Sequence, residues 1–243
     1  MSGVDFAEVE RHTDQVRIRL NLGNAPIPDI TSILEDAGLV VLVRPLGEFG
    51  PDGLYVRRDQ FSVALLNGDK YLPRLRFTGA HELGHHEYGA VSALDEDIHG
   101  SAAPEETRAN AFAASFLMPR EALAERVGGR QPVPAELVLD VANEFGVSYE
   151  TLVYRLHNTR LLRGGAAARN SLMAERSFLF TADLRQRRLE TRSIVPSDYV
   201  VRAVRAYRGD RISLDRLAEL LYADREGMAT ALKEAGLLHP EDA

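Results

Sequence analysis

The chain has 243 residues, a hydrophobic content of 45% and a formal net charge of −7, enough for one large domain or two small ones. Its acidic balance argues against a protein that coats nucleic acid, which would be basic overall. Cysteine is absent, which excludes disulfides and thiolate chemistry, so any metal must be held by His, Asp or Glu. Because no segment has the pattern of a membrane helix or a signal peptide, we expect a soluble cytoplasmic protein.

The first part of the chain predicts two helices and then a small sheet. Apolar and charged residues alternate at near-helical spacing over 6–20, and a second helix is expected over 29–38, where Gly38 suits the C-terminal end. Runs rich in β-branched residues predict strands over 39–46, 53–57 and 61–66. A small sheet therefore precedes the histidine-bearing segment.

The rest of the chain is predicted to be mainly helical, in two domains. Helices are expected over 75–88, 104–118, 134–145 and 148–162, and Ala109, Phe112 and Phe116 form part of a buried stripe on the second of these. The glycine- and alanine-rich segment 163–168 predicts a linker. Beyond it we expect a short hairpin over 178–191 and helices over 197–207, 213–221 and 225–235. The predicted domains are residues 1–165 and 166–243, the second being smaller and of α or α+β type.

The strongest chemical signal is the sequence His81-Glu82-Leu83-Gly84-His85, an H-E-x-x-H motif. Residues four apart on a helix lie about 5–6 Å apart at Cβ, close enough for two imidazoles to hold one zinc ion. Glu82 is too close in sequence to be a third ligand, but it can act as a general base on water at the metal. Two surface histidines on a polar helix are the alternative, which we disfavour.

The third ligand of a catalytic zinc site must come from elsewhere in the chain. No Lys or Arg occurs between Arg76 and Arg108, and this acidic stretch suits a divalent cation. For residues 95–97, however, we favour a solvated acidic loop over a metal site. His86 points elsewhere on the helix, and His99 is expected in a loop. Spacing alone does not choose between Glu105 and Glu106, which both precede the buried stripe. The alternative for both is that they bind no metal and are first-turn glutamates, which the helix dipole favours. The candidates are His86, His99, Asp95, Glu96, Asp97, Glu105 and Glu106.

Two segments together resemble the ImmA/IrrE family of metallopeptidases. Residues 76–85 are similar to the family's R-F-T-x-A-H-E-L-G-H segment, and residues 106–113 with 117–119 to its E-x-x-A-N-x-F-A and L-M-P segments. The resemblance covers about residues 10–162. It implies an α+β, zincin-like domain in which Glu106 is the third zinc ligand, beside His81 and His85. It also implies a cytoplasmic, site-specific endopeptidase that cleaves a helix-turn-helix repressor and so derepresses stress, phage or mobile-element genes. Gly79 replaces a usually bulky residue, which should affect helix packing and not chemistry.

Several features leave alternatives open. The group that stabilises the oxyanion is not identified, and its candidates are Tyr88, Tyr149, Arg155 and His157. The C-terminal segment 211–232 resembles a helix-turn-helix and follows arginines at three-residue steps, but its balanced charge favours a small packing domain over a nucleic-acid-binding one. The rival function is a non-proteolytic regulator that uses the peptidase fold as a scaffold and binds DNA or a partner. Glu82 favours the enzyme, because a zinc scaffold alone does not need it.

Overall fold

The computed structural model describes residues 4–90, 92–95, 104–175 and 197–242. The chain divides into two compact units, Met1–Ser193 and Ile194–Ala243, which are described separately. Within the described ranges no helix combines the length and the apolar character needed to cross a membrane. The hairpin expected over 178–191 and the candidate ligands Glu96, Asp97 and His99 lie outside the described residues.

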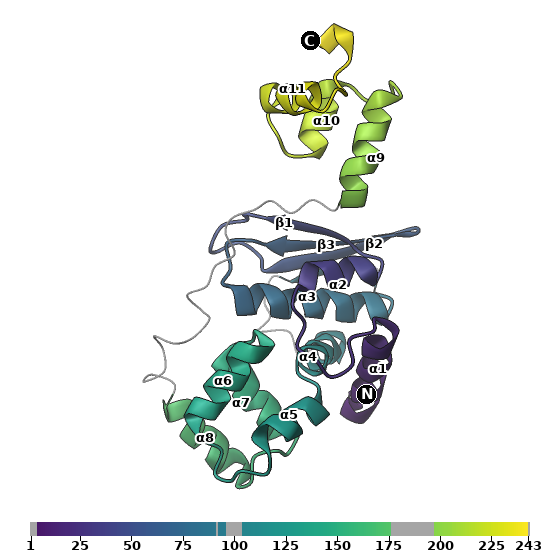
Figure 1. Ribbon diagram of the computed structural model, residues 1–243. Coiled ribbons are helices and arrows are strands. Elements are labelled where there is room, and N and C mark those ends of the chain that lie inside the picture. The colour runs from purple at the N-terminus through teal and green to yellow at the C-terminus, as the bar shows by residue number, and fades with distance from the viewer. Residues whose placement is uncertain (1–3, 91, 96–103, 176–196, 243) are drawn as a thin grey trace. The chain divides into compact units, whose positions relative to one another are not determined.

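The first unit contains a four-stranded sheet in the order β1-β3-β2-β4. Strand β1 (Val40–Arg44) is parallel to β3 (Phe61–Asn67), and β2 (Gly53–Arg58) is antiparallel to both β3 and β4 (Ser92–Asp95). Alternate side chains, such as Val41, Tyr55 and Ala64, are buried on the face that α2 (Ile30–Asp36) and α3 (Leu72–Glu87) cover (Figure 1). Three strands were predicted and β4 was not.

The remaining helices of this unit confirm the predicted α+β class. They are α1 (Phe6–Arg19), α4 (Pro104–Leu117), α5 (Arg120–Val127), α6 (Ala135–Phe145), α7 (Tyr149–Asn158) and α8 (Gly165–Glu175). Side-chain caps begin three of the helices, because the Asp5, Asp29 and Ser148 side chains accept hydrogen bonds from backbone N–H groups in the first turn. The predicted stripe on α4 is buried, with Phe112 and Phe116 stacked at 5.5 Å.

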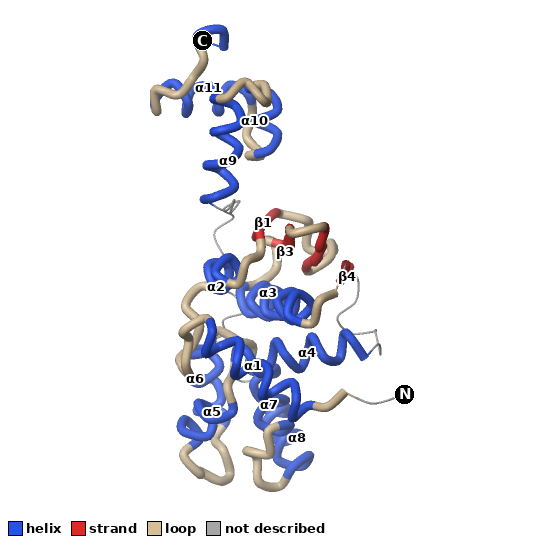
Figure 2. The backbone as a smooth tube through the Cα atoms, turned by 90° about the vertical axis from the view of Figure 1, so that its right-hand side faces the viewer, coloured by secondary structure: helices blue, strands red, loops and turns tan. Residues whose placement is uncertain are grey.

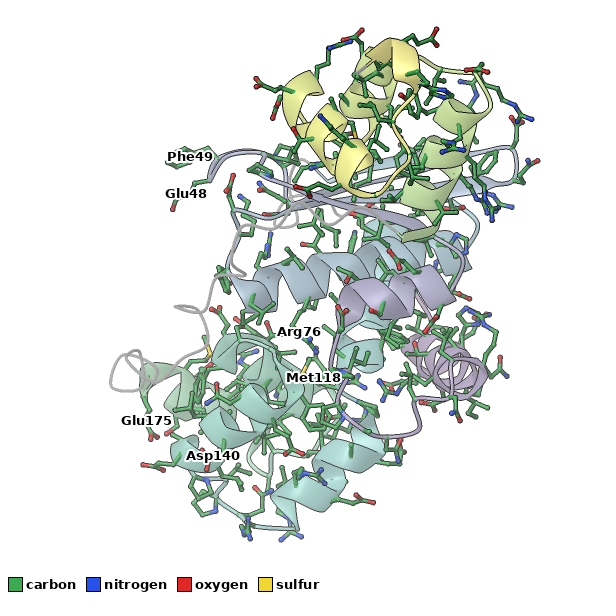
Figure 3. All side chains as sticks on the ribbon, turned by 45° about the horizontal axis from the view of Figure 1, so that its top comes forward. Glu48, Phe49, Arg76, Met118, Asp140 and Glu175 are labelled. Carbon is green, nitrogen blue, oxygen red and sulfur yellow. The ribbon has the colours of Figure 1, made fainter. Side chains whose placement is uncertain are left out.

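Buried arginines join these helices through backbone carbonyls. The Arg76 guanidinium on α3 donates to the carbonyls of Ile27 and Phe145, which lie before α2 and at the end of α6. The Arg155 Nε atom on α7 donates to the Met118 carbonyl at 3.0 Å. Arg76 and Met118 lie in the interior below α3, whereas Phe49 projects from the loop between β1 and β2 (Figure 3). These long-range bonds hold α3 and α4 in a fixed frame.

Helices α3 and α4 lie side by side and share the most extensive packing of any two described helices (Figure 2). A Cβ atom on Gly84 would lie 3.2 Å from the Cα atom of Ala109, so glycine permits this close approach. A Cβ atom on Gly79 would lie 3.0 Å from Ile30 on α2. The small residue at position 79 therefore serves helix packing, as expected.

The segment 163–168 is not a linker. Gly164 turns the chain with φ +94°, and helix α8 begins at Gly165 and packs against α7. The three alanines that follow are strong helix formers. The Tyr149 hydroxyl donates to the Leu172 carbonyl at 3.0 Å, and Leu172 is buried. The boundary between the two compact units lies between residues 193 and 194 instead. The division of the chain into functional domains at residues 1–165 and 166–243 stays a prediction.

The second unit contains the three helices expected there. Helices α9 (Ser197–Arg208), α10 (Leu214–Leu220) and α11 (Arg225–Glu234) are followed by a short 3-10 helix, η3 (Pro240–Asp242). Ser213 and Asp224 cap α10 and α11. The unit has its own small core, made by Ala203, Tyr207, Leu214, Leu217, Ala218, Met228 and Leu232.

Candidate active site

Three side chains from α3 and α4 meet at one point in the first unit. The Nε2 atoms of His81 and His85 lie 3.0 Å apart. The Glu106 carboxylate lies 3.2 Å from His81 Nε2 and 3.3 Å from His85 Nε2. The two imidazoles are buried, and the Glu106 side chain is 26% exposed. The H-E-x-x-H spacing and the close α3–α4 packing at Gly84 together produce this cluster.

Asn110 determines which nitrogen of His81 faces the cluster. The Asn110 Oδ1 atom, which can only accept, lies 3.0 Å from His81 Nδ1, so that nitrogen carries the proton. The Nε2 atom of His81 therefore faces the Glu106 carboxylate and His85 Nε2. Two imidazole nitrogens and a carboxylate this close together are stabilised by a proton or a cation that lies between them.

The surroundings favour the ionisation states in which these residues bind metals. Burial, reinforced by repulsion from His81, lowers the pKa of His85. The hydrogen bond to His81 is the main cause that lowers the pKa of Glu106, against the effect of burial. A neutral imidazole and an ionised carboxylate are the forms that a divalent metal requires.

The donor set and its dimensions fit zinc. A tetrahedral site with bonds of about 2.0–2.1 Å separates neighbouring donors by about 3.3 Å. The three donor–donor distances here are 3.0, 3.2 and 3.3 Å. Two imidazoles and one carboxylate also leave a fourth position open, as a catalytic site requires. These residues form one of two groups in the described chain whose ligand atoms are close enough for a metal ion.

The second such group lies in the C-terminal unit and fits a metal less well. It comprises Asp210, His239 and Glu241, and both carboxylates are exposed. The His239 Nε2 atom lies 3.0 Å from the Tyr207 carbonyl oxygen, to which it donates. That nitrogen therefore offers no lone pair to a cation.

Glu82 follows His81 in the chain and lies on the sheet side of α3. Glu82 is fully buried, and its carboxylate lies against Gly53 of β2. A Cβ atom at position 53 would come within 2.6 Å of Glu82 Oε1 and 2.4 Å of Thr78 Cγ2. Glycine at this position thus provides the space that the Glu82 carboxylate occupies.

The other ligand candidates lie away from the cluster. Glu105 is exposed in the first turn of α4. The His86 Nδ1 atom is 3.1 Å from the Tyr55 hydroxyl, so this imidazole faces the sheet. The side chain of Asp95 is not described. Of the two glutamates that spacing left open, Glu106 is the one that meets His81 and His85.

In the part of the chain that the structure describes, no hydrogen bond, ion pair or ring contact joins a candidate oxyanion-stabilising group to the cluster. The Tyr149 hydroxyl is bonded to Leu172, and the Arg155 guanidinium is paired with Glu10. His157 lies on α7 and contacts none of the three clustered side chains in the described structure. Tyr88 lines a cavity together with His85, but its ring packs on His12 and Phe112.

Two residues that matter for the site were not assigned a role from the sequence. Asn110 follows Glu106 by four residues, so both lie on the same face of α4, and this spacing was the signal available. Gly53 carried no signal, because its importance depends on how closely β2 approaches α3. Long-range packing of this kind is not visible in a local pattern.

Fold and site together define a metallopeptidase-like protein. A family model described as the IrrE N-terminal-like domain, peptidase M78, matches residues 34–157, about half of the chain and all four site residues. The chain belongs to this family. Comparison with curated proteins gave no match. The predicted family is thereby confirmed, and the C-terminal unit lies outside the matched range.

Proposed function

We propose that the protein is a zinc-dependent, site-specific endopeptidase. The observation that carries this proposal is the convergence of His81, His85 and Glu106, with Glu82 buried on the same helix as the two histidines. Two imidazole nitrogens 3.0 Å apart, each within 3.3 Å of a carboxylate, form an arrangement that a divalent cation stabilises. Membership of a peptidase family supports the same conclusion.

In this proposal His81, His85 and Glu106 hold the zinc ion, and Asn110 orients His81. The metal supplies a Lewis acid that polarises the peptide carbonyl and makes water more acidic. Glu82 accepts a proton from the attacking water and delivers it to the leaving nitrogen. Its burial against Gly53 keeps the carboxylate in one position, so little reorganisation is needed before proton transfer.

We propose a helix-turn-helix transcriptional repressor as the substrate, so that cleavage derepresses stress, phage or mobile-element genes. The support is the resemblance to the ImmA/IrrE family in residues 76–85 and 106–119. The enzyme would then act in the cytoplasm, where the repressor is. The C-terminal unit, with a core of its own, would recognise the substrate or sense the signal.

The test is cleavage of a small helix-turn-helix protein encoded beside this gene. Wild-type protein with bound zinc should cleave it at one site and leave casein almost intact. Glu82→Gln should keep zinc and lose cleavage by several orders of magnitude. If Glu82→Gln derepressed the target genes as well as the wild type does, the protein would be a non-proteolytic regulator, which is the rival function.

A further inference from the structure

Arg108 on α4 is an isolated cation close to the metal-binding cluster. It is the only Lys or Arg in the stretch 77–119, which holds seven Asp and Glu residues. The other arginines of α3 and α4 already have oxygen partners, since Arg74 donates to Asp52 and Arg76 donates to two backbone carbonyls. Among the described residues no hydrogen bond or ion pair engages Arg108, and its buried Nε atom has no acceptor. A half-buried guanidinium in this state favours an oxygen ligand from outside the chain.

Arg108 lines a cavity of about 380 Å3 whose wall also includes the metal-binding residue His85. The cavity lies between the end of α3 and the first turns of α4, and its free surface is mainly polar. Gly89 and Glu105 belong to its walls and are exposed, so the cavity opens to solvent. A ligand that enters it can therefore reach the Arg108 guanidinium and the surroundings of His85 together.

Tyr88 holds the Arg108 side chain in place. The Cζ atom of Arg108 lies 4.2 Å from the centroid of the Tyr88 ring, which is a cation–π contact. The Tyr88 ring itself packs on His12 of α1 and Phe112 of α4, with ring centroids 5.1 and 6.1 Å apart. Because the ring fixes the guanidinium in advance, little side-chain entropy is lost when a ligand binds to it.

The charges at this cavity favour a carboxylate as the ligand. With zinc bound, two neutral imidazoles and the Glu106 carboxylate leave the cluster with a net charge of about +1. Arg108 adds a positive charge at the cavity that His85 lines, and an anion between the two reduces their repulsion. Glu105 also lines the cavity, but it is exposed and forms no ion pair with Arg108 in the described ranges, so it offsets this charge only weakly. A guanidinium binds a carboxylate through two parallel hydrogen bonds.

We propose that Arg108 is a specificity-determining residue that binds an acidic side chain of the substrate next to the cleaved bond. This inference rests on the proposed function, because it needs a metal ion at His81, His85 and Glu106. The carboxylate of a substrate Asp or Glu enters the cavity and accepts two hydrogen bonds from Arg108, while Tyr88 keeps the guanidinium in position. Cleavage sites in the repressor are thereby restricted to exposed segments that carry Asp or Glu at this position.

Hydroxamates that anchor on zinc test this site without a known substrate. Calorimetry on the zinc-loaded full-length protein compares three pairs of compounds, each made of a carboxylic acid and the amide of the same shape. The first pair carries the acidic or amide side chain on the N-terminal side of the hydroxamate, and the second pair carries it on the C-terminal side. The third pair has no such side chain and ends in a free or an amidated C-terminal carboxyl group. In one of the first two pairs we expect the acid to bind about ten times or more tightly than its amide.

Variants then locate the bound carboxylate. Arg108→Met keeps a long side chain and removes its charge, so it should abolish the preference for the acid while the amides bind as before. Arg108→Lys keeps the charge without the two parallel donors and should retain part of the preference. Arg120→Met, at an exposed arginine of α5, is the matched control and should keep the whole preference.

The outcomes separate this proposal from the proposed function. Equal binding of acid and amide in the first two pairs, or a preference that survives Arg108→Met, would overturn the assignment of Arg108. A preference confined to the third pair would mean that the site binds the end of a chain, and it would overturn the assignment of a side chain. A protein that takes up no zinc in direct metal analysis would instead refute the proposed function.

Discussion

The backbone of Gly53 and the carboxylate of Glu82 occupy adjoining space, and a Cβ atom on Gly53 would lie 2.6 Å from Glu82 Oε1. Strand β2 and helix α3 therefore approach so closely at this point that only glycine fits. The position of the proposed general base thus depends on a residue in the sheet, 29 positions earlier in the chain.

Gly53→Ala should lower repressor cleavage while zinc binding stays near the wild-type level. The added methyl group displaces Glu82 or Thr78, and a shift of about 1 Å in a proton-transferring group costs about 100-fold in rate. The measurements are kcat and zinc content. Leu54→Ala is the control, because this neighbour on β2 points to the opposite face of the sheet. Unchanged kcat in Gly53→Ala would show that Glu82 does not need this space.

Zinc content distinguishes Glu106 from Glu105. His81→Ala, His85→Ala and Glu106→Ala each remove one donor of the cluster and should reduce zinc from about one ion per chain to almost none. Glu105→Ala is the matched control on the same turn of α4, and it should retain the metal. Metal analysis after dialysis measures this. Full zinc occupancy in Glu106→Ala, with loss in Glu105→Ala, would reverse the assignment.

Asn110 should control zinc affinity through His81. Asn110→Ala removes the acceptor for His81 Nδ1, so the ring is freer to turn and the affinity should fall about 10- to 100-fold. Asn110→Asp keeps an acceptor and should bind zinc nearly as well as the wild type does. Asn158→Ala, at an exposed position on α7 that lines a cavity together with Asn110, should have no effect. Competition with a chelator gives the affinities, and an Asp variant as weak as the Ala variant would contradict the role.

The elements predicted from the sequence were those with a strong local pattern. The β-branched residues of Val40–Arg44 predict a strand, and the apolar stripe of α4 recurs at helical spacing, so each segment indicates its own secondary structure. Strand β4 has only the four residues Ser92–Asp95, without a β-branched residue, and it owes its structure to pairing with β2. Helix α5 was missed because Pro119 was assigned only as the end of α4, although it also precedes the first turn of α5.

The same distinction applies to the site. His81, Glu82 and His85 form a local motif, and the choice of Glu106 followed from the resemblance because spacing left Glu105 open. The contacts that complete the site, Asn110 with His81 and Gly53 with Glu82, join different elements. They depend on how α3 packs against α4 and β2, and no periodicity along the chain encodes that distance.

Tyr149 should make the stability of the protein depend on pH in alkaline solution. Burial raises the pKa of this phenol to about 12, above the value of about 10 in the unfolded chain. Its contribution is therefore complete below pH 10 and is lost as the pH rises toward 12, by about 1 kcal/mol between pH 9 and 11. Tyr149→Phe should be less stable at pH 8 by about 1 kcal/mol, because the bond to Leu172 is lost.

Urea unfolding at several pH values checks this prediction. The difference in unfolding free energy between wild type and Tyr149→Phe should become smaller from pH 9 to pH 11. Tyr222→Phe, at a residue that is 58% exposed in the C-terminal unit, should follow the wild-type curve throughout. A constant difference between wild type and Tyr149→Phe would mean that the phenol ionises equally in both states.

Two shortened proteins should separate the role of α8 from that of the C-terminal unit. A chain that ends at Ser193 keeps α8 and the whole first unit, so it should bind zinc and unfold near the temperature of the first unit in the full-length protein. A chain that ends at Gly165 loses the buried Leu172 and the partner of Tyr149. It should unfold about 5–10 °C lower, because a buried leucine and a hydrogen bond are lost.

Repressor cleavage by the chain ending at Ser193 then reports on the C-terminal unit alone. We expect this chain to bind zinc as the full-length protein does and to cleave the repressor more slowly, or without dependence on cellular stress. Calorimetry measures the stability of the first unit. Electrophoresis of extracts from stressed and unstressed cells measures cleavage of the repressor. Equal cleavage by both chains under all conditions would exclude a recognition or sensing role for residues 194–243 and leave the peptidase assignment intact.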